Sequence, residues 1–204
     1  MSGRYRVLGL DPSLTSFGLA KITPEGKVHV ERVRSRKRGH DRLNEILAHV
    51  RAWGSWCDLA VIEGLAFGAK GNALLELAGL QHLVRHELWN LGVPYAIVSP
   101  YTRAEYATGR AGADKDEVLA AAIRRYGHLA EITSNDTADA VIFAAIGKHR
   151  LGEPVAETPG YATALLTKVH SDKRRRGQPV IAWPELPAPS MALATVAGPE
   201  EGTA

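Results

Sequence analysis

The stretch VLGLDPSLTSFGLA, residues 7–20, decides how the chain folds. An apolar run reaches Asp11 and stops at Pro12, small hydroxyl residues follow, and apolar residues resume at Phe17. Consecutive apolar positions are typical of a strand in a sheet that is covered on both faces. The stretch therefore predicts a buried strand with a carboxylate at its tip, followed by a second strand. One Asp before a Pro is also typical of a turn, so its role depends on partners elsewhere in the chain.

The rest of the chain predicts a mixed α/β sheet of five strands flanked by helices. Strands are expected at residues 5–10, 17–22, 28–33, 58–62 and 93–98, with the second and third forming a hairpin around a turn cluster at residues 23–26. Apolar residues at helical spacing predict helices at residues 41–53, 71–91, 115–126 and 135–149. This order predicts a sheet that starts antiparallel and continues parallel after the first helix.

Composition fits an ordinary globular protein rather than a membrane or disulfide-rich one. The 204 residues are 45% hydrophobic and 23% charged, and charges interrupt every apolar run before it reaches the length of a membrane span. The first residues lead almost directly into the first strand, which predicts no signal peptide. The lone Cys57 has no cysteine partner for a disulfide or a zinc site. These features predict a cytoplasmic location, in a bacterial cell or, if the gene is viral, in its host.

The sequence changes character after residue 152. Residues 1–152 carry the strand and helix patterns and are expected to form one domain. Residues 153–204 are rich in Pro, Ala, Gly and basic residues without a sustained period, which predicts a largely disordered tail. Basic residues crowd two places, and such clusters can neutralise phosphates of a nucleic acid or be solvated surface. For a charge run taken alone the solvated surface is the preferred interpretation. The candidates for nucleic-acid contact in these clusters are Arg36, Lys37, Arg38, Lys173, Arg174, Arg175 and Arg176.

Four carboxylates are predicted to meet at one edge of the sheet. Asp11 ends the first strand and Glu63 ends the fourth, and in this topology the two strands are neighbours. Asp136 and Asp139 lie three residues apart on the last long helix and therefore share a face. Such a cluster is repulsive by itself, but Mg²⁺ binds oxygen ligands of this kind and keeps places for water and phosphate oxygens. Two such ions can hold the attacking water and the leaving oxygen of a phosphodiester.

The chain resembles the RuvC-type Holliday-junction resolvases of the RNase H-like superfamily. The matching motifs are GLDPSLTSFGLA, LAVIEGLAFGAKGNALLELAGLQ, GADKDEV and SNDTADAVIFAAIGKH, which occur in the family's order over roughly residues 5 to 150. The resemblance implies an RNase H-like fold, two Mg²⁺ ions that Mn²⁺ can replace, and a homodimer that nicks two strands of a four-way DNA junction. It also implies the catalytic residues, which are Asp11, Glu63, Asp136, Asp139 and, in the K-x-x-V motif, Lys115; the four carboxylates would bind the metal.

Two positions depart from the family pattern. Ser13 stands where the family usually has Gly, and Ala66 stands where it has an aromatic that stacks on bases at the junction centre. Phe67, one residue later, is the candidate for that role, and the alternative is a core residue. Lys70 in the same loop is a candidate phosphate contact. Lys115 fits a solvated helix start as well as a catalytic position.

The helix predicted at residues 71–91 has more apolar surface than one interface needs. One stripe is wide enough to pack on the sheet, and a second stripe lies around the other side, where a monomer is normally polar. We expect a two-fold dimer to cover the second stripe, although a neighbouring helix of the same chain could do so. The first stripe is Ala73, Leu77, Leu80, Val84 and Leu88, and the second is Leu74, Leu75, Ala78 and Trp89.

Other functions stay open at this point. Nucleases of this superfamily also cut flaps, forks and RNA–DNA hybrids. A nucleic-acid-binding protein without catalysis is a second alternative, although it leaves the four carboxylates unexplained. An actin-like or sugar-kinase-like protein has a similar first phosphate loop, but that fold needs a second comparable domain that 204 residues do not provide.

Overall fold

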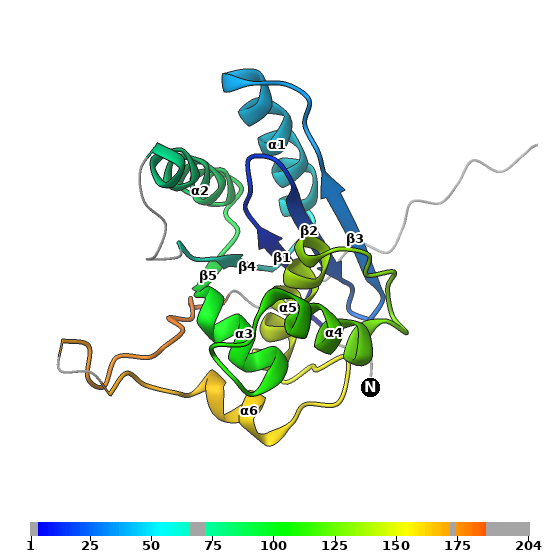
Figure 1. Cartoon of the computed structure of the whole chain (residues 1–204), viewed down its shortest axis with the longest axis vertical. Coiled ribbons are helices and arrows are strands. Elements are labelled where there is room, and N and C mark those ends of the chain that lie inside the picture. The colour runs from blue at the N-terminus through cyan, green and yellow to red at the C-terminus, as the bar shows by residue number, and fades with distance from the viewer. Residues whose placement is uncertain (1–3, 66–71, 172–173, 187–204) are drawn as a thin grey trace, which may run out of the picture.

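The computed structural model describes residues 4–65, 72–171 and 174–186. It contains the predicted five-stranded mixed sheet with helices on both faces, shown in Figure 1. The elements in chain order are β1 (Val7–Asp11), β2 (Phe17–Ile22), β3 (Val28–Val33), α1 (Gly39–Gly54), β4 (Leu59–Glu63), α2 (Asn72–Asn90), β5 (Tyr95–Val98), α3 (Pro100–Thr108), α4 (Lys115–Tyr126), α5 (Asn135–Arg150) and α6 (Gly160–Leu166).

The strand order across the sheet is β3-β2-β1-β4-β5. The first three strands pair antiparallel, while β1 with β4 and β4 with β5 pair parallel, which confirms the predicted topology. Leu10 is paired with Ile62, so Asp11 and Glu63 end adjacent strands at the same edge. The sheet thus brings two residues together that are far apart in the sequence.

Each face of the sheet has its own core. On one face Leu8 and Leu10 of β1 pack with Ile46 of α1 and with Leu80 and Val84 of α2. On the other face the core is formed largely by α5, with contributions from α3, α4 and α6. Figure 1 shows α1 and α2 on one side of the sheet and α3, α4, α5 and α6 on the other.

Helix α5 lies unusually close to the sheet because two glycines face it. A Cβ atom on Gly9 of β1 would lie 2.0 Å from the carbonyl oxygen of Ala140 and 2.5 Å from the amide nitrogen of Ala144. A Cβ atom on Gly18 of β2 would lie 2.2 Å from the carbonyl oxygen of Asp136. Both contacts are shorter than any real Cβ contact, so the absence of a side chain at these positions determines how near α5 lies to β1 and β2.

Two helices were not predicted from the sequence. Helix α3 follows β5 directly: Ser99 caps it by accepting a hydrogen bond from the amide of Thr102, Pro100 occupies its first turn, and Gly109 ends it with a φ of 82°. These are ordinary start and stop signals, but the helix is only 9 residues long and has no long apolar stripe. Helix α6, 7 residues long, has no side-chain cap, and its sequence alone gives little indication of a helix.

The segment predicted as a tail begins with residues that pack on the domain. Ala162 and Leu165 of α6 are buried, as is Ile181, and all three belong to the same core as α5. Val169 and Pro179 form an isolated antiparallel β-bridge. The core formed by the first 152 residues therefore extends into the following segment. In the described parts of the chain, no helix has both the length and the apolar character needed to cross a membrane.

Candidate metal centre

Three carboxylates from separate elements converge at the edge of the sheet. Asp11 comes from the end of β1, Glu63 from the end of β4 and Asp139 from α5, and one ligand oxygen of each lies within 4.8 Å of the others. Asp11 and Asp139 are 8% and 5% exposed. We refer to Asp11, Glu63 and Asp139 as the triad.

Contacts to the backbone help to position Glu63 and Asp139. The carbonyl oxygen of Glu63 accepts a hydrogen bond of 2.9 Å from the buried side chain of Gln81 on α2. Asp139 lies in the second turn of α5, whose start is held by a capping box between Ser134 and Thr137. Because these supports are part of the sheet and of its packed helices, the three carboxylates have little freedom to move apart.

Burial and mutual repulsion make the charged triad costly. Burial raises the pKa of Asp11 well above its usual value, and the nearby carboxylates of Glu63 and Asp139 raise it further. Burial likewise raises the pKa of Asp139 to about 7, although Arg103 and Lys115 act in the opposite direction. Hard oxygen donors at this separation are the ligands that a divalent cation such as Mg²⁺ prefers, and such a cation would relieve the repulsion. The triad therefore fits the predicted metal.

One cation of the chain, Arg103, already lies at the triad, and it was not predicted from the sequence. The guanidinium group of Arg103 on α3 donates a short hydrogen bond from Nη1 to Oδ2 of Asp139, and the same Nη1 lies 3.4 Å from Oε1 of Glu63. Arg103 is 6% exposed. Only recognition of α3 immediately after β5 could have indicated it, since a helix there returns across the end of the sheet where the carboxylates lie.

The fourth predicted carboxylate is bound elsewhere. Asp136, one turn before Asp139, accepts a hydrogen bond of 2.6 Å from Oγ of Ser16 and forms a 2.7 Å ion pair with Arg32 of β3. Its oxygens are not among those that lie together in the triad. Asp136 still adds negative charge near Asp139 and contributes to its raised pKa. Its role as a metal ligand stays a prediction.

Lys115 is exposed at the first position of α4. Its charge acts on Asp139, since it lowers the pKa of that carboxyl against the larger effect of burial. The predicted lysine thus lies near enough to Asp139 for its charge to act on that carboxyl, and its catalytic role stays a prediction.

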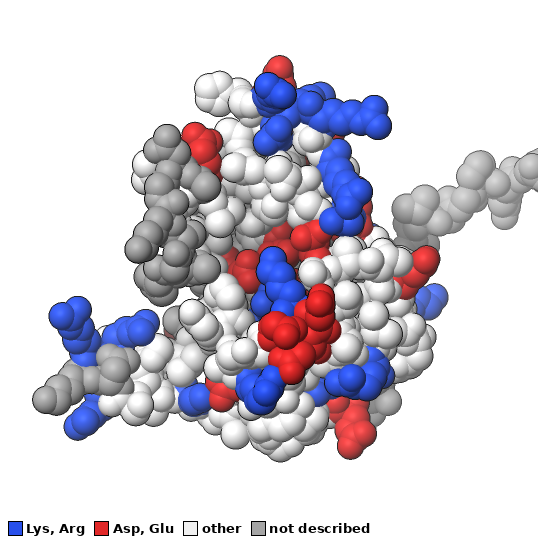
Figure 2. Space-filling model, viewed as in Figure 1, with Lys and Arg blue, Asp and Glu red and all other residues white. Residues whose placement is uncertain are grey.

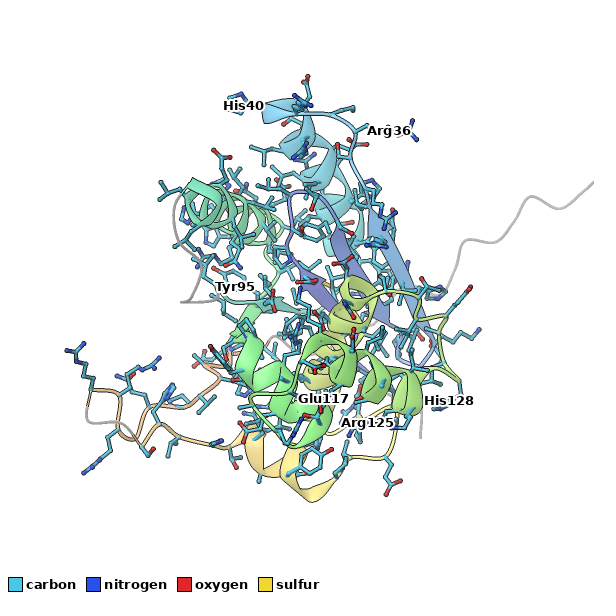
Figure 3. The ribbon with its side chains drawn as sticks, in the orientation of Figure 1. Arg36, His40, Tyr95, Glu117, Arg125 and His128 are labelled. Atoms are coloured by element: carbon cyan, nitrogen blue, oxygen red, sulfur yellow. The ribbon has the colours of Figure 1, made fainter. Side chains whose placement is uncertain are left out.

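The predicted DNA contacts fall into two groups. Phe67, Lys70 and Lys173 lie outside the described residues. The basic loop, which we define as residues 34–38 between β3 and α1, exposes Arg36, Lys37 and Arg38, and Figure 3 shows Arg36 pointing away from the body of the molecule.

The basic residues and the acidic residues share one face of the protein. In Figure 2 basic side chains gather at the top of the molecule, over the connection between β3 and α1, while acidic side chains form a band near the middle. The segment that carries the exposed residues Arg174, Arg175 and Arg176 extends from the lower part of the same view. Basic groups therefore lie on two sides of the acidic band.

The sequence is similar to that of a known junction-cutting enzyme. The crossover junction endodeoxyribonuclease RuvC of Synechococcus sp. (strain WH7803) is 29% identical to this chain over 152 residues, which are 70% of this chain and 97% of that protein. No protein-family model matches the chain.

Solved structures share the fold. The RuvC structure of Thermus thermophilus aligns with a TM-score of 0.59, and the same protein in complex with a Holliday junction substrate aligns with 0.60; each is 22% identical, covers 76% of this chain and matches over 99% of its own length. The fowlpox virus resolvase in complex with Holliday junction DNA aligns with a TM-score of 0.53 at 10% identity, over 72% of this chain and 98% of its own. These similarities confirm the predicted RNase H-like fold.

Proposed function

We propose that this chain, a RuvC-like protein in sequence and fold, is an endodeoxyribonuclease that resolves four-way DNA junctions by paired nicks. The observation that carries the proposal is the triad, in which three carboxylates converge at the carboxyl ends of two adjacent parallel strands. A buried site of this kind, beside exposed basic groups, suits hydrolysis of a DNA phosphodiester. The sequence similarity to a crossover junction endodeoxyribonuclease supports the choice of substrate.

Divalent cations are the cofactors that fit this site. We expect two Mg²⁺ ions, with Mn²⁺ able to substitute, and we assign Asp11, Glu63, Asp139 and Asp136 as their ligands. Bound ions would supply the positive charge that phosphodiester hydrolysis requires. For Asp136 to bind a metal, its carboxylate must share or leave its contacts with Ser16 and Arg32.

The chain's own residues would bind and orient the DNA. Lys115 would contact the scissile phosphate, since its charge already reaches Asp139. The basic loop, together with Arg174, Arg175 and Arg176, would bind the phosphates of the arms, with Lys173 and Lys70 as further contacts. Phe67 would stack on bases at the junction centre. Since cellular DNA lies in the cytoplasm of a bacterium, this function also implies the predicted location.

A two-fold dimer would match the symmetry of the junction. Each chain has one triad and makes one nick, so two chains related by a two-fold axis are needed to resolve a four-way junction symmetrically. Helix α2 offers a surface: Leu80, Val84 and Leu88 of its first stripe are buried, while Leu75 and Trp89 of its second stripe are 71% and 72% exposed. Leu74 and Ala78 of the second stripe are half-buried, and we infer that a second copy of the chain covers the exposed Leu75 and Trp89.

The test is cleavage of end-labelled DNAs by the purified full chain in Mg²⁺. The panel comprises a four-way junction, a flap, a fork, a linear duplex and an RNA–DNA hybrid of the same flanking sequences. We expect symmetric paired nicks in the junction and little cutting of the duplex. Preferential cleavage of flaps, forks or hybrids would indicate a nuclease of the same fold with a different substrate. Binding without any cleavage would refute the proposed enzymatic activity.

A further inference from the structure

Arg103 differs from every other basic residue near the candidate metal centre because it is buried between the carboxylates themselves. Its side chain is 8% exposed, and its Nη1 contacts both Asp139 and Glu63. Its charge also acts on Asp11, where it lowers the pKa of that carboxyl against burial and repulsion. A single guanidinium thus offsets part of the charge of all three triad members.

The hydrogen bonding of this guanidinium is incomplete. Arginine has five N–H donors, and Nε of Arg103 is buried without a hydrogen-bond partner among the residues that the structure describes. An unsatisfied buried donor is costly. In the described part of the chain, the side-chain hydrogen bonds of Arg103 go to Asp139 and Glu63, so the triad supplies the polar contacts of this guanidinium.

The oxygens that Arg103 contacts are also metal ligands under the proposed function. Oδ2 of Asp139 accepts its hydrogen bond and Oε1 of Glu63 lies 3.4 Å from it. A divalent ion bound at these oxygens would bring two positive charges close to a third in a buried site. The guanidinium and the ion therefore cannot both occupy the triad at low cost.

We propose that Arg103 is an internal cation that stabilises the triad in the metal-free protein and competes with the divalent ion for Asp139 and Glu63. This inference rests on the proposed function, because both require a divalent ion at the triad. Arg103 is a positioning residue in this scheme: it keeps the carboxylates assembled before metal binds and turns away when the ion enters. The arginine side chain has several rotatable bonds, so the guanidinium can leave the triad without a movement of α3.

The experiment measures metal binding to the full chain without DNA. Isothermal titration with Mn²⁺ compares the unmodified protein with Arg103→Met, Arg103→Lys and Arg110→Met. Arg110 is the matched control because it is an exposed arginine that pairs with Glu117 outside the triad. We expect Arg103→Met to bind Mn²⁺ roughly tenfold more tightly or better, since a competing charge is removed, and we expect the lysine and the control variants to stay near the unmodified affinity.

A second measurement does not depend on the folding of Arg103→Met. In ¹H–¹⁵N spectra of the unmodified chain, the side-chain Nε–H of Arg103 is identified by its loss in Arg103→Lys. We expect this signal to be protected from solvent exchange without metal and to shift or lose protection as Mg²⁺ is added. A signal that stays unchanged at Mg²⁺ saturation would overturn the proposal.

The outcomes separate this proposal from the nuclease assignment. Equal or weaker Mn²⁺ binding by Arg103→Met, in a protein that cuts junctions, would refute the competition alone. Absence of Mn²⁺ binding in every variant would refute the metal site and the competition together. Tighter binding by Arg103→Met would support the competition even if the preferred DNA substrate proved to be a flap or a fork.

Discussion

Replacement of Asp139 by Asn tests whether burial or ion pairing dominates in the triad. Burial raises the pKa of Asp139 from 3.8 to about 7, and the contact with Arg103 reduces this rise without abolishing it. The folded chain therefore holds this proton more tightly than the unfolded chain does. In the metal-free protein the free energy of unfolding should fall as pH rises from about 4 to about 7, because the unfolded state binds fewer protons there. Asp11, whose pKa is also raised, contributes in the same direction.

The expected change in the free energy of unfolding follows from the size of the pKa shift of Asp139. A difference of roughly three pH units corresponds to about 4 kcal/mol for full ionisation of Asp139, taken as an upper value. Asn has nearly the same shape and does not ionise, so Asp139→Asn should be more stable than the unmodified metal-free protein by about 1 to 4 kcal/mol near pH 8. The gain should be smaller near pH 5. The variant should also lose junction cleavage while it keeps junction binding, which depends mainly on phosphate contacts.

Urea denaturation in the presence of EDTA, near pH 5 and near pH 8, measures the stability difference. Asp136→Asn is the matched control because it removes a carboxylate from the same helix but outside the triad. We expect it to keep most of the pH dependence of the unmodified chain, since Asp136 makes only a minor contribution to the raised pKa of Asp139. If Asp139→Asn were less stable near pH 8 and kept that pH dependence, the ion pair with Arg103 would outweigh burial. Full cleavage activity in this variant would refute the assignment of Asp139 as a metal ligand.

Three further predictions concern the surface and the packing. Replacing all of residues 36–38 with Ala should weaken junction binding and lower the number of counterions released on binding by up to about three. Fluorescence anisotropy at several salt concentrations measures this number, and an unchanged value would exclude these residues from the interface. Lys148 is 1% exposed and forms a 2.6 Å ion pair with Glu153, so Lys148→Met should cost about 1 to 3 kcal/mol in urea denaturation, since Glu153 keeps its hydrogen bonds from the amides of Arg4 and Tyr5; a neutral effect would contradict this. Leu75→Glu combined with Trp89→Glu should give folded monomers in sedimentation; a monomeric unmodified chain would refute the dimer.

The strand pattern predicted the sheet and, through it, much of the site. Asp11 and Glu63 could be placed side by side because strand ends are visible in the sequence and parallel neighbours end at the same edge. Helical spacing added Asp139, which the structure brings to the other two. These predictions depend on periodicity, which is visible in short stretches of chain, and on one topological rule that places the ends of parallel neighbours at the same edge.

The remaining features depend on contacts that local patterns do not report. Asp136 and Asp139 share a helix face by spacing, yet Asp136 is bound by Ser16 and Arg32, and Arg32 is 104 positions away in a basic stretch that reads as solvated surface. Arg103 is an isolated basic residue in a helix too short to show a clear period. Its partners lie 36 and 40 residues away, so only the folded chain reveals that it is buried between carboxylates.

Helix α5 links the stability of the fold to the geometry of the site. The same close approach that requires glycine at positions 9 and 18 holds Asp139 at a fixed height above the end of β1, and every residue from Thr137 to Lys148 is buried. Asp139 therefore cannot adapt its position to a ligand without disturbing the core. Arg103 is also buried, but its guanidinium is separated from the backbone of α3 by several rotatable bonds, so it can change position while α3 stays in place. The metal-free site thus combines fixed carboxylates with one movable cation, and binding of an ion requires the cation to move while the carboxylates stay in place.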